Sequence, residues 1–133
     1  AGCGPFALAL LACLFVVTIS SDGTVTLPFG TVSGNLLSAS KEFLGIPFAP
    51  EPARFASAQL WNQSYEDGHL DATSYAAQCP QSFPAGAAIA QHATFSEDCL
   101  YLTIYTPREQ PGEETPWPVM FWIHGGALRV GSA

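Results

Sequence analysis

The chain has 133 residues, with eleven acidic and four basic side chains, so its formal net charge at pH 7 is −7. This excess of acidic side chains does not favour binding to nucleic acids or anionic membranes, and it argues against both as partners. The length is enough for one small domain, and the acidic composition suits an extracellular soluble protein.

Residues 1–20 carry no charge, and Phe6–Ile19 is apolar except for Thr18. An apolar run of this length is typical of a secretory signal, and it is shorter than the roughly 20 residues that span a bilayer. Small residues then precede Ser21, where we predict cleavage. We therefore expect a signal peptide over 1–20, a secreted protein, and no membrane span in the mature chain. A buried core helix and a membrane anchor are the alternatives for this segment.

Two of the four cysteines, Cys3 and Cys13, fall inside the predicted signal, which leaves Cys79 and Cys99 in the mature chain. An even pair in an exported protein predicts one disulfide, with two reduced buried thiols as the alternative.

A glycosylation sequon, Asn-Gln-Ser, begins at Asn62 in a polar stretch, and we expect this asparagine to be the acceptor.

The first predicted elements after the signal are short strands at Thr24–Leu27 and Thr31–Leu37, which are separated by glycine and proline. We expect them to form a small antiparallel sheet at the edge of the domain. Residues 43–50 follow as an apolar, turn-rich segment. The three prolines between positions 47 and 52 argue against both a regular helix and a central strand here.

Residues 51–98 show no sustained helical or strand period, and a disulfide between the two remaining cysteines would tie this irregular stretch down. Leu100–Tyr105 is predicted as a strand, followed by a charged loop over 107–116. Val119–Ile123 is then an uninterrupted apolar run. Such a run predicts a strand buried on both faces, as in the parallel core of an α/β protein.

His124, Gly125 and Gly126 come directly after this predicted strand. A glycine pair lets the backbone turn sharply and leaves N–H groups unobstructed by side chains. Such donors can bind the anion that develops during acyl transfer, where one donor contributes about 2.7 to 4 kcal/mol to lowering the barrier. The alternative is an ordinary turn at the end of a strand.

Several blocks of the sequence together resemble the N-terminal part of the type-B carboxylesterase and lipase family, which includes cholinesterases and fungal lipases. They occur in the order and near the spacing of that family, and SEDCLYL with WIHGG is the specific pair. The blocks are GTVSGN at 30–35, FLGIPFAP at 43–50, RF at 54–55, DATSYAAQCPQ at 71–81, SEDCLYLTIYTP at 96–107 and PVMFWIHGGALRVGSA at 118–133.

The resemblance implies an α/β-hydrolase fold, of which residues 21–133 form the N-terminal portion with the small edge sheet and the first strands of the central sheet. It also implies roles for particular residues. Cys79 and Cys99 match the first disulfide of the family, which pins a loop over the active-site gorge. Arg54 and Glu97 match a structural ion pair. Residues Gly126 and Ala127 match the two loop positions whose N–H groups face the oxyanion.

The histidines are not expected to take part in catalysis or metal binding. The family position that matches His124 is structural. His69 and His92 lie in predicted loops without the spacing of metal ligands. We therefore predict no metal and no cofactor.

A G-x-S-x-G nucleophile elbow is absent from these residues, and in this fold the Ser, the acid and the His come in that order after the oxyanion loop. We therefore interpret the sequence as an N-terminal fragment of a secreted serine esterase or lipase, inactive without the downstream triad. The expected substrate is a small-molecule or lipid ester. A choline ester is not expected, because the loop over 80–98 lacks the tryptophan of cholinesterases. The alternative is a non-catalytic adhesion or binding relative, and the oligomeric state is not predicted.

Overall fold

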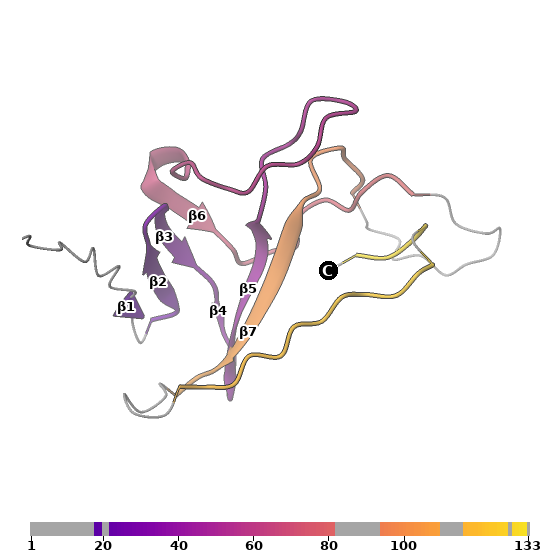
Figure 1. The fold of residues 1–133 in the computed structure, drawn as a ribbon. Coiled ribbons are helices and arrows are strands. Elements are labelled where there is room, and N and C mark those ends of the chain that lie inside the picture. Colours follow the sequence, from indigo (N-terminus) through magenta and orange to yellow (C-terminus); the bar gives the residue numbers. More distant parts are fainter. Residues whose placement is uncertain (1–17, 20–21, 82–93, 110–115, 128, 133) are drawn as a thin grey trace, which may run out of the picture.

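Among the residues that it describes, the computed structural model has two small β-sheets, and the chain runs between them through Gly34 and through longer irregular segments (Figure 1). The residues that it describes are 18–19, 22–81, 94–109, 116–127 and 129–132. In chain order the elements are β1 (Thr18–Ile19), β2 (Thr24–Leu27), β3 (Gly30–Ser33), β4 (Asn35–Leu36), β5 (Ser40–Pro47), the short 3-10 helix η1 (Glu66–Gly68), β6 (His69–Asp71) and β7 (Tyr101–Pro107).

The first sheet has the strand order β1-β2-β3-β6. The pairs β1–β2 and β2–β3 are antiparallel, whereas β6 lies parallel to β3, so this edge sheet is mixed rather than purely antiparallel as predicted. Strand β1 belongs to the predicted signal segment, and cleavage before Ser21 would remove it. The rest of that segment lies outside the described residues, and the signal stays a prediction. In the described part of the chain, no helix has the length and apolarity needed to cross a membrane.

The second sheet has the order β4-β5-β7 and shows that the exclusion of a central strand at 43–50 was wrong. β5 pairs antiparallel with β7 from Ser40 opposite Pro107 to Pro47 opposite Tyr101. Pro47 is the last residue of β5, so its missing N–H does not interrupt the ladder. The register shifts between Phe43 and Ile46, where β5 contains one more residue than β7 and Gly45 has φ +66°.

The predicted strand Thr31–Leu37 is divided between the two sheets at Gly34. The Gly34 N–H donates to the carbonyl of Gly23 (3.1 Å). A Cβ at Gly34 would overlap the Glu42 carbonyl and come within 2.5 Å of the Phe43 ring, so this crossing of the backbone depends on glycine. The chain thereby passes from one sheet to the other within a single residue.

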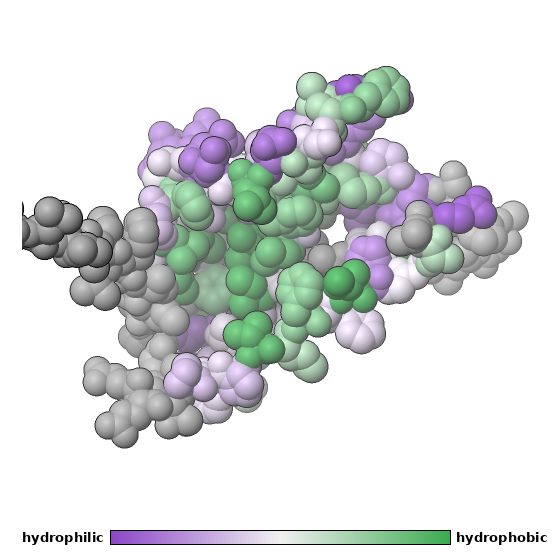
Figure 2. All heavy atoms as spheres, viewed as in Figure 1, coloured by the Kyte–Doolittle hydropathy of each residue, from purple (hydrophilic) through white to green (hydrophobic). Residues whose placement is uncertain are grey.

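A small core lies between the sheets and the irregular segments. Val32 of β3, Phe43 of β5, Tyr65 and Ala72 are buried together. Tyr65 packs edge-on against Phe29, with ring centroids 6.4 Å apart. Figure 2 shows hydrophobic atoms gathered in the middle of the face in view, over the two sheets, with hydrophilic atoms toward its upper edge and right end.

The predicted buried strand Val119–Ile123 is not a strand, and its side chains are not buried. They are between 76% and 93% exposed, and no described strand pairs with this segment, which Figure 1 draws as an extended trace. An apolar run predicts that a segment is suited to burial, but burial itself requires cover on both faces. The described residues do not provide that cover.

Gly30 and Gly68 provide a test of the contact between β3 and η1. Both have positive φ, +132° and +70°, but a Cβ at Gly30 would overlap the Gly68 carbonyl, whereas one at Gly68 meets nothing within 4 Å. We expect Gly30→Ala to lower the free energy of unfolding by at least about 3 kcal/mol and Gly68→Ala by about 1 kcal/mol. Urea denaturation of both variants checks this, and equal losses would contradict the close approach.

Candidate active site

The predicted oxyanion loop has a backbone shape that requires glycine at its centre. Gly126 has φ +127°, and a Cβ there would overlap the carbonyl of Val130. Ala127 follows with φ +53°, a left-handed conformation that alanine adopts only when its surroundings impose it. The two residues therefore form a sharp, constrained turn after the extended segment.

The hydrogen bonds within the turn do not use the N–H groups of Gly126 and Ala127. The Gly126 carbonyl accepts from the N–H groups of Arg129 (3.0 Å) and Val130 (3.2 Å). The N–H groups of Gly126 and Ala127 have no hydrogen-bond acceptor among the described residues. Ala127 is exposed and Gly126 partly so, which leaves two adjacent backbone donors able to bind an anion.

The histidines are placed as follows. His124 is exposed, and its Nδ1 donates to the Gly125 carbonyl (2.8 Å), because a carbonyl can only accept. His69 is also exposed, and its Nδ1 lies 3.0 Å from the Thr31 hydroxyl oxygen. His92 lies outside the described residues. In the described ranges, no group of three or more His, Cys, Asp or Glu side chains is arranged to hold a metal ion.

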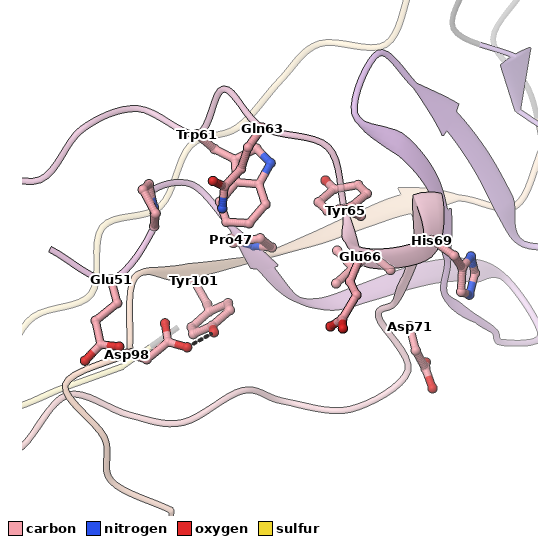
Figure 3. A pocket seen from close by; sticks show the side chains of 12 residues that line it. Pro47, Glu51, Trp61, Gln63, Tyr65, Glu66, His69, Asp71, Asp98 and Tyr101 are labelled. Carbon is pink, nitrogen blue, oxygen red and sulfur yellow. Dashed lines mark hydrogen bonds between the residues drawn. The ribbon is translucent and has the colours of Figure 1, made fainter.

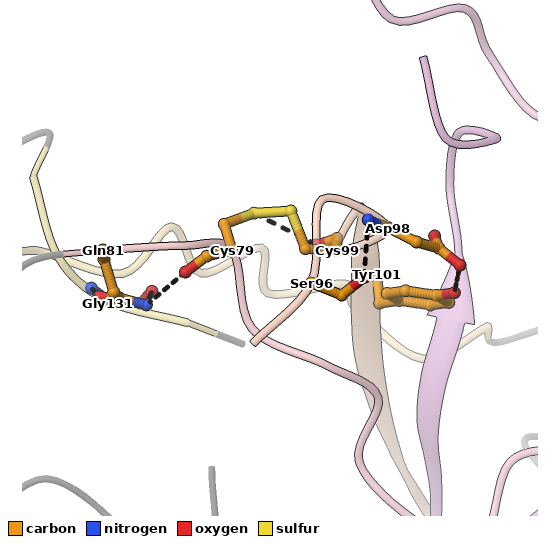
Figure 4. Close-up of a disulfide and its surroundings, with 7 residues drawn as sticks. All are labelled: Cys79, Gln81, Ser96, Asp98, Cys99, Tyr101 and Gly131. Carbon is orange, nitrogen blue, oxygen red and sulfur yellow. Dashed lines mark hydrogen bonds between the residues drawn. A yellow bond between two sulfur atoms is a disulfide. The ribbon is translucent and has the colours of Figure 1, made fainter. Parts of the chain in front are cut away.

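The disulfide predicted from the cysteine count is confirmed: Cys79 and Cys99 are bonded, with their Cα atoms 4.9 Å apart (Figure 4). The chain beside it is also paired through the backbone. The Gln78 N–H donates to the Thr94 carbonyl (2.8 Å), and the Ser96 N–H donates to the Gln78 carbonyl (3.0 Å). The disulfide therefore reinforces this backbone pairing just before β7 begins at Tyr101.

Gln81 is a residue of this region that was not among the predicted site residues. Its side-chain amide accepts from the Gly131 N–H (2.7 Å) and donates to the Gly131 carbonyl (3.0 Å), as Figure 4 shows beside the disulfide. It also donates to the Cys79 carbonyl (3.2 Å). The only signal in the sequence was its place in the CPQ block, two residues after Cys79.

Arg54 and Glu97 form the expected ion pair through Nη1 and Oε1. The two side chains are 69% and 58% exposed, so the pair lies at the surface. The Arg54 guanidinium also lies over the ring of Phe55, 5.2 Å from its centroid.

Because the ion pair is exposed, we expect Arg54→Ala to change the free energy of unfolding by less than about 1 kcal/mol at 0.15 M salt. The double-mutant cycle with Glu97→Ala, measured by thermal unfolding, isolates the coupling between the two side chains. A coupling energy above about 2 kcal/mol would show that the pair is buried in solution.

A separate cavity of about 390 Å³ is lined by residues of β5, β6 and β7 and of the irregular segments beside them (Figure 3). The Tyr101 hydroxyl donates to Asp98 (2.8 Å) in its wall, and burial together with this hydrogen bond raises the pKa of Tyr101 to about 12. None of its lining residues belongs to the loop around Gly126, so the cavity is not part of the predicted oxyanion site. Its other polar and aromatic lining residues include Glu51, Trp61, Gln63, Tyr65 and Glu66.

Comparison with known proteins gives a consistent family. The model of the carboxylesterase family matches residues 21–133. Carboxylesterase 1F of Mus musculus is 36% identical over 149 aligned positions, which cover 96% of this chain and 26% of that protein. Carboxylesterase 1D of Rattus norvegicus is 42% identical over 106 positions, which cover 68% of this chain and 18% of that protein.

A solved structure of a thermophilic PNB esterase superimposes with a TM-score of 0.68 at 34% identity, covering 83% of this chain and 23% of that one. The fold is therefore the N-terminal part of an α/β-hydrolase, and the chain spans about a quarter of the length of the proteins it matches. The match over 21–133, together with these identities, shows that the chain belongs to the carboxylesterase family.

Proposed function

We propose that the full-length protein containing this chain is a secreted serine hydrolase of carboxylic esters, and that Gly126 and Ala127 supply two of the three N–H donors of its oxyanion hole. The observation that carries the proposal is the pair of adjacent N–H groups without an acceptor among the described residues, in a turn with positive φ at both positions. Membership of the carboxylesterase family supports the same chemistry.

In the proposed reaction a serine hydroxyl from a segment after residue 133 attacks the ester carbonyl, and a histidine base takes its proton. The carbonyl oxygen becomes an oxyanion, which accepts hydrogen bonds from Gly126, Ala127 and the residue after the serine. Collapse of the tetrahedral intermediate expels the alcohol, which takes the proton from histidine. Water then releases the acid from the acyl-enzyme by the reverse sequence. The substrate is a small-molecule or lipid ester, and no cofactor is required.

Export of the protein is part of the proposal. The disulfide between Cys79 and Cys99 is of a kind that persists in oxidising compartments. Asn62 is exposed, as an acceptor of N-linked glycan must be. A signal peptide over residues 1–20, an exported mature chain and glycosylation at Asn62 are mutually consistent.

Turnover of 4-nitrophenyl acetate and butyrate by the purified full-length protein tests the proposed activity. We expect saturable hydrolysis with a burst of nitrophenol equal to the enzyme concentration if deacylation is slow. A downstream sequence in which the nucleophilic serine is replaced, together with no turnover, would instead support the non-catalytic binding relative.

A further inference from the structure

Gln81 connects the disulfide region to the turn that carries Gly126. Its amide uses both hydrogens as donors, to the Gly131 and Cys79 carbonyls, and its oxygen accepts from the Gly131 N–H. Rotating the amide by half a turn would set its oxygen against two carbonyls and its NH₂ against an N–H. The neighbours therefore fix a single orientation of the side chain.

Gly131 in turn lies directly against the residues of the loop. Its φ is +127°, and a Cβ at this position would overlap His124 Nδ1 and come within 2.7 Å of the Gly125 carbonyl. The adjacent Val130 donates to the Gly126 carbonyl (3.2 Å). A shift of the Gly131 backbone would therefore move the groups that set the direction of the Gly126 and Ala127 N–H donors.

The backbone that carries Gln81 is held in place by the disulfide and by backbone hydrogen bonds. Cys79, two residues earlier, is covalently bonded to Cys99, and Gln78 is paired through its backbone with the segment over 94–96. Gln81 and Gly131 are 50 residues apart in the chain, so the amide provides a contact that local structure does not. Figure 4 draws Gln81 and Gly131 together beside the disulfide.

We propose that Gln81 is a positioning residue for ester hydrolysis: its amide holds the Gly131 backbone and thereby aims the N–H groups of Gly126 and Ala127 at the oxyanion. This inference rests on the proposed function. It predicts an effect on the transition state rather than on substrate binding, because Gln81 acts on donors whose hydrogen bonds strengthen as the oxyanion forms.

The test uses Gln81→Glu and Gln81→Ala in the full-length protein, with the exposed Gln59→Glu as the charge-matched control. Glutamate has the same shape, but its carboxylate sets an oxygen against the Gly131 and Cys79 carbonyls. We expect kcat for 4-nitrophenyl butyrate to fall ten- to a hundredfold in both Gln81 variants, with KM changed less than threefold. The control should retain wild-type kcat.

Two further readouts separate positioning from a structural role. The affinity for a trifluoromethyl ketone, whose adduct with the serine resembles the tetrahedral intermediate, should fall in parallel with kcat while the unfolding midpoint stays within a few degrees. Hydrogen exchange should accelerate in the peptide covering 124–132.

If the wild type is active and the Gln81 variants keep its kcat and its affinity for the ketone, the positioning role is overturned. A wild type that neither turns over ester nor binds the ketone would overturn the proposed function, and the exchange data would then report whether the contact with Gly131 exists in solution.

Discussion

Replacing Gly126 by alanine is expected to lower kcat for ester hydrolysis by about 10² to 10³-fold in the full-length protein, the effect of losing one oxyanion donor. A methyl group at this position overlaps the Val130 carbonyl, and φ +127° is unfavourable for alanine. The turn must therefore reorganise, and the N–H groups of Gly126 and Ala127 turn away from the developing charge. KM should change much less, since the interaction is made in the transition state.

Ala127→Gly is the matched control for this variant. Glycine keeps the N–H and adopts φ +53° more readily than alanine, so kcat should stay within about threefold of wild type. Active-site titration of both variants gives the concentration of active enzyme. Steady-state kinetics then show whether a lower rate comes from a lower kcat or from less active protein. Wild-type kcat in a fully folded Gly126→Ala variant would contradict the assignment of this loop to the oxyanion hole.

Removing the disulfide with the double variant Cys79→Ser, Cys99→Ser is expected to lower the free energy of unfolding by about 3 kcal/mol. The bridge closes a loop with a sequence separation of 20 residues, and in the chain-entropy model such a cross-link restricts the unfolded state by this amount. None of the described side chains between the two cysteines is buried, so packing there offers little to replace the bond.

Chemical denaturation under oxidising conditions measures this loss of unfolding free energy. The reduced wild type serves as the control and should unfold at the same denaturant concentration as the double variant, whereas reductant should not affect the variant itself. Equal stability of the oxidised wild type and the double variant would show that the bridge does not restrict the unfolded chain.

The parts of the fold that sequence predicted well are those with a local cause. β2 has the predicted bounds Thr24–Leu27, and β7 lies within two residues of the predicted strand. β2 is a β-branched run between Gly23 and Pro28, and β7 is rich in β-branched and aromatic residues and ends at Pro107, so the local pattern determines both. The disulfide followed from counting the cysteines outside the predicted signal, because two cysteines allow only one pairing.

The parts that sequence missed depend on contacts between distant residues. β6 has three residues and exists because His69–Asp71 pairs with β3, which no pattern within it indicates. β5 was excluded because its prolines were counted without regard to their position at and beyond the strand end. The contact of Gln81 with the backbone of Gly131, 50 residues away, leaves no local signal.

The site was predictable only as a family pattern. Glycine at 126 indicates a tight turn. Only the structure shows that a Cβ at this position would overlap the Val130 carbonyl, and that the N–H groups of Gly126 and Ala127 have no acceptor among the described residues. For Val119–Ile123 the apolar run indicated a buried strand, whereas the described residues leave it exposed. Hydrophobicity determines what a segment is suited to contact, and the contact itself depends on what lies beside it.

The most direct test of the central claim is to treat the purified full-length protein with a fluorophosphonate and map the modified residue by mass spectrometry. We expect one serine after residue 133, in a G-x-S-x-G sequence, to be modified in step with loss of 4-nitrophenyl butyrate turnover. Gly126→Ala should slow the labelling, since phosphonylation also develops charge on an oxygen in the same hole. A folded protein that is neither labelled nor active would contradict the claim that this chain supplies the oxyanion loop of a serine esterase.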